Sequence, residues 1–288
     1  MITISLALLC LLASGMLDLV FKIYVSKNGS RGLMIAGIAV IWGALQFTFM
    51  MKNGIVFSSD HATLFFGGLA ALALTVSNIA LLECLSKLPI SVASTIYRLN
   101  TIPLVLMAVV FLGEGLDVYR ILGVLVGLLT VVLLHSRISE TSRHPAYDLF
   151  WFGLILFACV VRASYGILTK AGLNAGAGAD SMMVLAALGW FIGGLLYFTM
   201  IESRRKIRLG PIYLIVIAGI LVFSVVWLLT NALLRGDASV VVPITNMGFV
   251  AAFVFSLAWR LEQLTFRKTM AIGSAIVSIG FLTFGMNS

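Results

Sequence analysis

The stretch PISVASTIYRLNTIPLVLMAVVFLGE, residues 89–114, decides how the rest of the chain is interpreted. It is almost entirely apolar and long enough to cross a lipid bilayer, which takes about 20 helical residues. It nevertheless carries Arg98 near its middle, and charge returns only at Glu114, where the stretch ends. A charged side chain inside such a run indicates a membrane helix with a functional role.

A related stretch lies in the second half of the chain, where residues 237–262 read DASVVVPITNMGFVAAFVFSLAWRLE. In each stretch a serine precedes a glutamate by 23 residues: Ser91 and Glu114 in the first, Ser239 and Glu262 in the second. Both residue types recur at one offset, 148 residues. The recurrence predicts a chain built from two related halves.

The composition indicates that lipid surrounds much of the chain. Hydrophobic residues make up 61% of the sequence and charged residues 10%, against roughly a quarter charged in soluble domains. The formal net charge is +8, but the basic residues lie between apolar runs and form no patch interleaved with aromatic residues. This pattern is typical of loops held against an anionic membrane face. We therefore expect a lipid bilayer as a partner and no nucleic acid.

Apolar runs separated by charged or Gly-, Pro- and Asn-rich breaks predict ten transmembrane helices. The N-terminal run lacks the basic start of a signal peptide, so we take it as the first span. The chain is thus expected to be an all-α integral membrane protein. The predicted spans are residues 2–25, 32–51, 61–85, 90–112, 117–136, 148–172, 181–201, 211–234, 238–259 and 268–286.

The ten spans divide into two five-helix repeats, residues 1–136 and 148–288, which a cytoplasmic linker at 137–147 joins into one transport domain. Because five is odd, the second repeat enters the membrane from the opposite side. Such inverted-topology repeats place a binding site between the halves near the midplane. The rare residues that align at the offset of 148 are Lys22 with Lys170, Trp42 with Trp190, Lys87 with Arg235, Ser91 with Ser239, and Glu114 with Glu262.

The distribution of Lys and Arg predicts the orientation in the membrane, because cytoplasmic loops carry an excess of both. Of the 19 such residues, 13 lie on the side of the loop that joins the first two spans, 4 lie on the other side, and 2 lie within spans. Both termini are therefore expected outside, and the cluster RRKIR at 204–208 inside. The expected location is the cell (inner) membrane.

Each half has a fourth span that closes in LGE (112–114) or RLE (260–262) and a fifth span that carries glycines, GVLVGLL at 123–129 and GSAIVSIG at 273–280. In this, and in its ten spans, the chain resembles the drug/metabolite transporter superfamily, and its EamA-like branch most closely. The resemblance covers essentially the whole chain.

This resemblance implies a secondary permease, without a tightly held cofactor, for small metabolites such as amino acids or their derivatives, phosphorylated compounds or sugar conjugates. An alternative is a flippase for a lipid-linked glycoconjugate, which part of the superfamily resembles. Four-span multidrug relatives carry an essential membrane Glu eight residues before a Lys. Here the positions eight before Lys22 and Lys170 are Ser14 and Arg162, which argues against an exporter of lipophilic cations.

The candidates for charges deep in the bilayer are Asp18, Arg98 and Arg162, which lie away from the ends of their predicted spans. Such groups are costly in a bilayer, by about 2.5–3.5 kcal/mol each on insertion scales, and mark functional sites by default. At 1.5 Å of rise per residue, Asp18 and Arg98 lie at similar depths and can form an ion pair. Helical spacing gives two polar stripes, one with Ser14 and Asp18, the other with Arg162 and Tyr165.

Our hypothesis is a water-filled cavity in which arginine binds an anion, because a guanidinium matches carboxylate and phosphate with two parallel bonds. Arg98 would form the positive pole, shared with Arg162. Asn246, the counterpart of Arg98 at the offset of 148, would form a neutral pole, and Tyr165 and Ser14 would line the site. The alternative is that Asp18 and Arg98 form an internal clasp while Arg162 either extends to the helix end or bonds to backbone carbonyls.

Glu114 and Glu262 match the family pattern but lie at the ends of spans, so we expect them to pair with nearby basic residues as structural helix-end groups. HExxH, GxSxG and Walker-type motifs are absent from the sequence, and its three histidines and three cysteines lack metal-ligand spacing. We therefore expect no enzyme activity, no metal and no cofactor. The expected partner is a small-molecule substrate, and pairing of two copies is left open.

Overall fold

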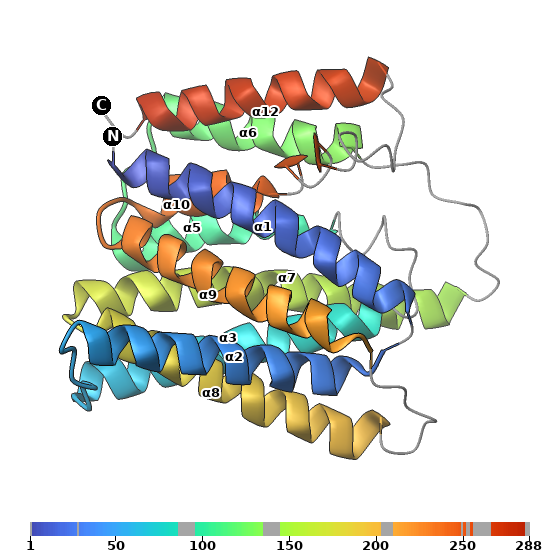
Figure 1. Cartoon of the computed structure of the whole chain (residues 1–288). Helices are drawn as coiled ribbons and strands as arrows, with labels where there is room; N and C mark the ends of the chain where they lie inside the picture. Colours follow the sequence, from blue (N-terminus) through green and yellow to red (C-terminus); the bar gives the residue numbers. More distant parts are fainter. Residues whose placement is uncertain are drawn as a thin grey trace.

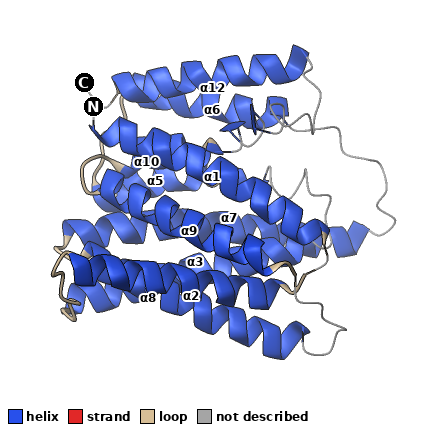
Figure 2. Ribbon diagram, viewed as in Figure 1, coloured by secondary structure: helices blue, strands red, loops and turns tan. Residues whose placement is uncertain are grey.

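The computed structural model describes residues 2–27, 29–85, 96–134, 145–202, 210–248, 250–251, 254–255 and 266–285. Within these ranges every extended element of regular structure is a helix, and the helices run along one common direction in a bundle (Figures 1 and 2). The helices are α1 (Ile2–Ser26), α2 (Arg31–Lys52), α3 (His61–Leu85), α5 (Thr101–Leu112), α6 (Val118–Leu134), α7 (Pro145–Asn174), α8 (Ala179–Tyr197) with a π-helical turn (Phe198–Glu202), α9 (Ile212–Leu233), α10 (Ala238–Asn246) and α12 (Phe266–Phe284).

Six of the described helical segments are long and apolar enough to cross a membrane. They are Ile2–Phe21, Arg31–Lys52, His61–Cys84, Leu149–Asn174, Ala179–Glu202 and Ile212–Leu233. The perimeter of the bundle is apolar: Phe47, Leu72 and Val110 are 61%, 60% and 74% exposed. Polar groups lie inside, where the fully buried Gln46 donates to Asp180 at 2.8 Å. An apolar outside around a partly polar inside is what lipid as solvent requires.

The contacts between helices correspond when the two halves are exchanged. Helix α1 packs on α9 as α7 packs on α3, and α2 packs on α9 as α8 packs on α3. Three further contacts join counterparts directly: α2 with α8, α6 with α12, and α5 with α10. The first of these is close, since a Cβ added to Gly32 would lie 2.8 Å from the carbonyl oxygen of Gly194. Small residues at such crossings let the two backbones approach.

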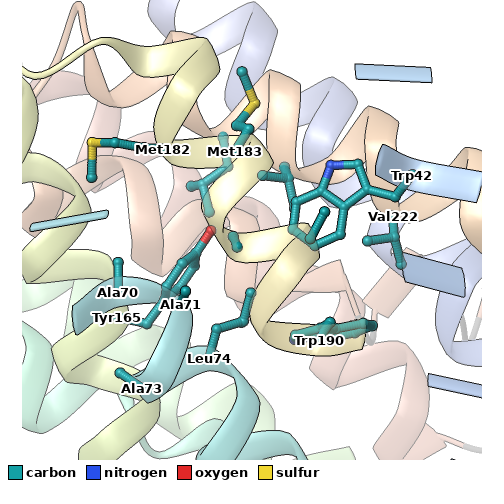
Figure 3. Packing of buried hydrophobic residues seen from close by; sticks show 14 of the residues in the cluster. Trp42, Ala70, Ala71, Ala73, Leu74, Tyr165, Met182, Met183, Trp190 and Val222 are labelled. Atoms are coloured by element: carbon teal, nitrogen blue, oxygen red, sulfur yellow. The ribbon is translucent and has the colours of Figure 1, made fainter. Parts of the chain in front are cut away.

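Two tryptophans mark the core beside this crossing. Trp42 of α2 and Trp190 of α8 contact each other edge to face, with ring centroids 6.0 Å apart. Both are buried, and they lie in one apolar cluster with Leu74, Tyr165 and Val222 (Figure 3). The alignment of the two halves at the offset of 148 residues pairs Trp42 with Trp190. Two residues at equivalent positions of the halves are therefore in contact.

The fourth and ninth predicted spans are interrupted, whereas the sequence analysis treated each as one helix. In the fourth, helical residues 96–98 are followed by a turn at Leu99 and Asn100 before α5 begins. Pro103 lacks an N–H, and its ring crowds the carbonyl four residues back, that of Leu99, so the break falls where proline chemistry puts it. In the ninth, α10 ends at Asn246 and a turn follows at Met247.

Acidic side chains from one half cap helices of the other. Glu202 accepts from the backbone N–H groups of Arg31 and Gly32 at 3.0 and 3.1 Å and from the Ser30 hydroxyl at 2.5 Å, at the start of α2. Glu114 accepts from the N–H groups of Ala238 and Ser239 at the start of α10. A carboxylate at a helix N-terminus satisfies free amides and the helix dipole, so these caps join the halves at their ends.

The end of the bundle that carries both termini (Figure 1) holds a cluster that we call the terminal clasp: Glu114, Asp117, Arg120, Asp237 and Ser239. Arg120 is its centre, with a side chain only 11% exposed. It donates to the Asp237 carboxylate at 2.7 Å, to the Ser239 hydroxyl at 3.1 Å, and to the carbonyls of Gly115 and Gly285 at 3.0 and 3.1 Å. The clasp therefore ties α6 to α10 and to the end of α12.

Candidate functional site

The two interrupted helices meet at a polar cluster in the interior of the bundle, which we call the central joint: Asp18, Arg98, Asn100, Thr101 and Asn246. Arg98 donates through Nη1 to the backbone carbonyl of Asn246 at 3.3 Å. That carbonyl belongs to the last residue of α10. The last carbonyl groups of an α-helix have no N–H partner within the helix, so they can accept hydrogen bonds from elsewhere. The interruption of the ninth span thus creates the acceptor that Arg98 uses.

Asp18 of α1 forms an ion pair with Arg98. The Arg98 and Asp18 side chains are 24% and 37% exposed, so the pair is only partly enclosed. The positive charge of Arg98 is therefore paired with the negative charge of Asp18. The sequence allowed this pair because the two residues lie at similar depths in their predicted spans. Of the two interpretations drawn from the sequence, this contact fits the internal clasp for Arg98.

The Asn246 side chain completes the joint. Its amide nitrogen Nδ2 lies 2.6 Å from Oδ1 of Asn100 and 3.2 Å from the Thr101 hydroxyl. Sequence reasoning did not single out Asn100, although an asparagine three residues before Pro103 in an apolar run was an available signal. Asn246 was expected to face a shared site from the second half, and the structure places it directly against the first half.

A pocket opens beside the joint, between α5, α6 and α10. Its empty space, which includes some open to the outside, is about 270 Å³. Arg98, Thr101 and Asn246 supply its polar lining. The apolar lining consists of Val124, Gly127, Leu128, Pro243 and Met247. The pocket thus combines a few polar groups with an apolar wall.

Arg162 lies on α7, away from the ion pair. Its guanidinium carbon is 5.2 Å from the centroid of the Tyr165 ring, within the range of a cation–π contact. Tyr165 is buried, and the Thr169 hydroxyl donates to its carbonyl at 2.8 Å. Tyr165 and Thr169 line a second pocket, of about 230 Å³ of empty space, with Thr230 of α9 and apolar residues of α3, α8 and α9. Tyr165 therefore faces the interior, and Arg162 contacts its ring.

The structure places the remaining expected site residues elsewhere. The Ser14 hydroxyl donates to the carbonyl of Cys10 in its own helix at 2.6 Å, and a Cβ added to Gly248 would lie 2.7 Å from the Ser14 Cβ. Ser14 is thus a packing residue beside the interruption of the ninth span. Glu114 lies at a helix end as expected, but its described partners are the amides of α10. Glu262 lies outside the described residues.

Metal-binding chemistry has no visible basis in the described part of the chain. There, His, Cys, Asp and Glu form no group of three or more suited to a metal ion. The three cysteines, Cys10, Cys84 and Cys159, are buried free thiols. The polar groups of the central joint are the Asp18–Arg98 ion pair, two amides and a hydroxyl, which bind polar groups by hydrogen bonding.

Comparison with known proteins shows the fold of this chain. No protein-family model matches the sequence, and no curated protein matches it. Solved structures do match, 29 chains in all. One of them, described only as "Crystal structure of protein", aligns over 99% of this chain and 97% of its own with a TM-score of 0.82 and 17% sequence identity. At that identity the likeness shows a shared fold alone.

Proposed function

We propose that this chain is a secondary transporter, a permease, of small anionic or zwitterionic metabolites such as amino acids or their derivatives. The observation that carries the proposal is the central joint, where charged and amide groups meet between two interrupted helices inside an apolar bundle. Interrupted membrane helices of this kind form substrate sites in transporters because their free ends offer bonding groups at the midplane. The substrate would bind between the halves and be exposed to each side in turn.

We further propose ten transmembrane helices arranged as two inverted-topology repeats. Support comes from the contacts that exchange between halves and from two residue pairs. In any two-fold arrangement, only residues close to the axis can touch their own counterparts. Trp42 touches Trp190 and Arg98 touches Asn246, each at an offset of 148 residues. These two contacts favour an axis that runs through the α2–α8 crossing and the central joint.

Membership of the drug/metabolite transporter superfamily, in its EamA-like branch, is proposed on the same basis. The resemblance of the LGE and RLE span ends and of the glycine-bearing spans supports it. The location would be the cell (inner) membrane, with both termini outside. Reporter fusions at Ser288 and near Arg205 test this orientation: a cytoplasmic C-terminus would contradict it.

The function is tested with purified protein in liposomes and a pool of amino acids, carboxylates and phosphorylated metabolites. We expect time-dependent, saturable uptake of at least one small anionic or zwitterionic compound, read by mass spectrometry of the washed vesicles. Empty liposomes are the control. Movement of long-chain glycolipids alone would support the flippase alternative and reject the proposal.

A further inference from the structure

The two interior arginines differ in how much of their charge the chain itself uses. Arg98 has a carboxylate partner in Asp18 and a carbonyl partner in Asn246. For Arg162, among the residues that the structure describes, no carboxylate lies within ion-pair distance. Its recorded contact is the face of the Tyr165 ring. The positive charge of Arg98 is therefore paired with a carboxylate, whereas that of Arg162 is not paired with a described carboxylate.

The guanidinium carbon of Arg162 lies over the Tyr165 ring, 5.2 Å from its centroid. A cation–π contact uses the positive charge and none of the five N–H donors as hydrogen bonds to an acceptor oxygen. Tyr165 is buried, so this contact holds the guanidinium on the inner side of α7. This geometry argues against the alternative in which Arg162 extends to the helix end.

An arginine without an acidic partner inside a membrane bundle is costly, and a cation–π contact offsets only part of that cost. The remaining compensation must come from water or from an anion that the protein binds. We propose that Arg162, and not Arg98, binds the carboxylate or phosphate group of the substrate, while the Asp18–Arg98 pair positions the interrupted helices. The inference rests on the proposed function and assigns the charge recognition within it.

The assignment is tested by the thermal stability of the purified full-length protein in detergent. Inorganic phosphate and L-glutamate are the two probes, titrated against sodium chloride at matched ionic strength, so that the phosphate and carboxylate arms are read separately. We expect at least one probe to raise the Tm of the wild type in a saturable manner, because binding to the native state stabilises it. Arg162→Gln should raise the half-saturating concentration about tenfold or more, since charge-assisted hydrogen bonds are lost.

Two further variants secure the result. Arg162→Lys keeps the charge without the planar fork, so we expect an intermediate response. Arg235→Gln is the matched control: Arg235 is exposed and bonds to Asn231 of its own helix, and the variant should respond like the wild type. A wild type that neither probe stabilises, or an Arg162 variant that responds like the wild type, would overturn the assignment.

The outcome separates this inference from the proposed function. If liposomes show no metabolite uptake while the probes still stabilise the protein through Arg162, the transporter proposal fails and the oxyanion site stands. If uptake occurs and Arg162→Gln transports and responds like the wild type, the transporter stands and the assignment fails.

Discussion

The central joint and the terminal clasp each contain an arginine paired with an aspartate, but the two sites are constructed differently. Arg120 of the clasp is 11% exposed and also bonds to two backbone carbonyls and a hydroxyl. Arg98 of the joint is 24% exposed, bonds to Asp18 and to the carbonyl of Asn246, and lines a pocket. The clasp lies at the outer start of α10, whereas the joint lies at its inner end, where α10 stops in the middle of the bundle.

This difference indicates separate roles for Arg120 in the clasp and Arg98 in the joint. Four hydrogen bonds from one buried guanidinium at a helix end favour stability. A partly exposed ion pair beside a pocket, at a point where the backbone is interrupted, favours a site that rearranges during transport. Variants in the two regions should therefore separate loss of transport from loss of stability.

The largest effect on transport is expected at Arg98. Arg98→Ala leaves Asp18 without its partner and the end of α10 without a donor, so we expect uptake at the level of empty liposomes. Arg98→Lys keeps the charge but loses the planar fork, and should transport markedly more slowly than the wild type. Both should insert normally in the membrane, measured by fractionation. Wild-type uptake by Arg98→Ala would make the joint a structural feature only.

Asp18→Asn tests the other half of the ion pair. The amide keeps an acceptor for Arg98 but loses the charge, and charge-assisted bonds are roughly twice as strong as neutral ones. We expect uptake to fall roughly tenfold, with any dependence on a proton gradient unchanged, because the role of the Asp18 carboxylate is to hold Arg98. Loss of that dependence in the variant, with substrate binding intact, would identify Asp18 as a proton carrier instead.

Arg120→Ala should act mainly on stability. Loss of its bonds to carbonyls and to Ser239 should cost on the order of 2–4 kcal/mol, with little added by the pair with the partly exposed Asp237. The measurement is Tm in detergent, with Arg235→Ala as the control at an exposed arginine. A variant with unchanged Tm that no longer transports would place the clasp in the transport cycle.

The smallest effect concerns Asp60, which precedes α3. The hydroxyls of Ser58 and Thr63 and the N–H of Thr63 donate to its carboxylate and hold its pKa at about 2, below the ordinary 3.8. A lowered pKa in the folded state means that the stabilisation is present above pH 3.8 and is lost as the pH falls to about 2. The Tm difference between wild type and Asp60→Asn should shrink over that range. A difference that is constant over it would contradict the cap.

Much of the helical layout could be predicted because apolar run length sets the helix length. The expected span 61–85 coincides with α3, and 211–234 differs from α9 by one residue at each end. The ion pair of Asp18 and Arg98 was one of the two interpretations drawn from the sequence. Counting residues from the ends of the predicted spans places both side chains at similar depths in the membrane. The interruption at Leu99 could also have been expected from Pro103 and the carbonyl four residues before it.

Other features depend on which helices become neighbours, and sequence spacing does not contain that information. Glu114 was expected beside a basic residue, yet α10 brings its free amides to it. The sequence analysis did not single out Arg120, and only folding places Asp237 and Gly285 around it. Pro243 did not reveal the end of α10, because the residue four before it lies in the first turn and the helix continues to Asn246.

One measurement tests the central claim, that a small anionic or zwitterionic metabolite crosses at a site between the two halves. It is the initial rate of uptake from the metabolite pool into liposomes, normalised to folded protein, for wild type, Arg98→Ala and Arg120→Ala. The account predicts saturable uptake by the wild type, background uptake by Arg98→Ala and retained uptake by folded Arg120→Ala. Absence of uptake by the wild type, or equal rates in the wild type and Arg98→Ala, would contradict it.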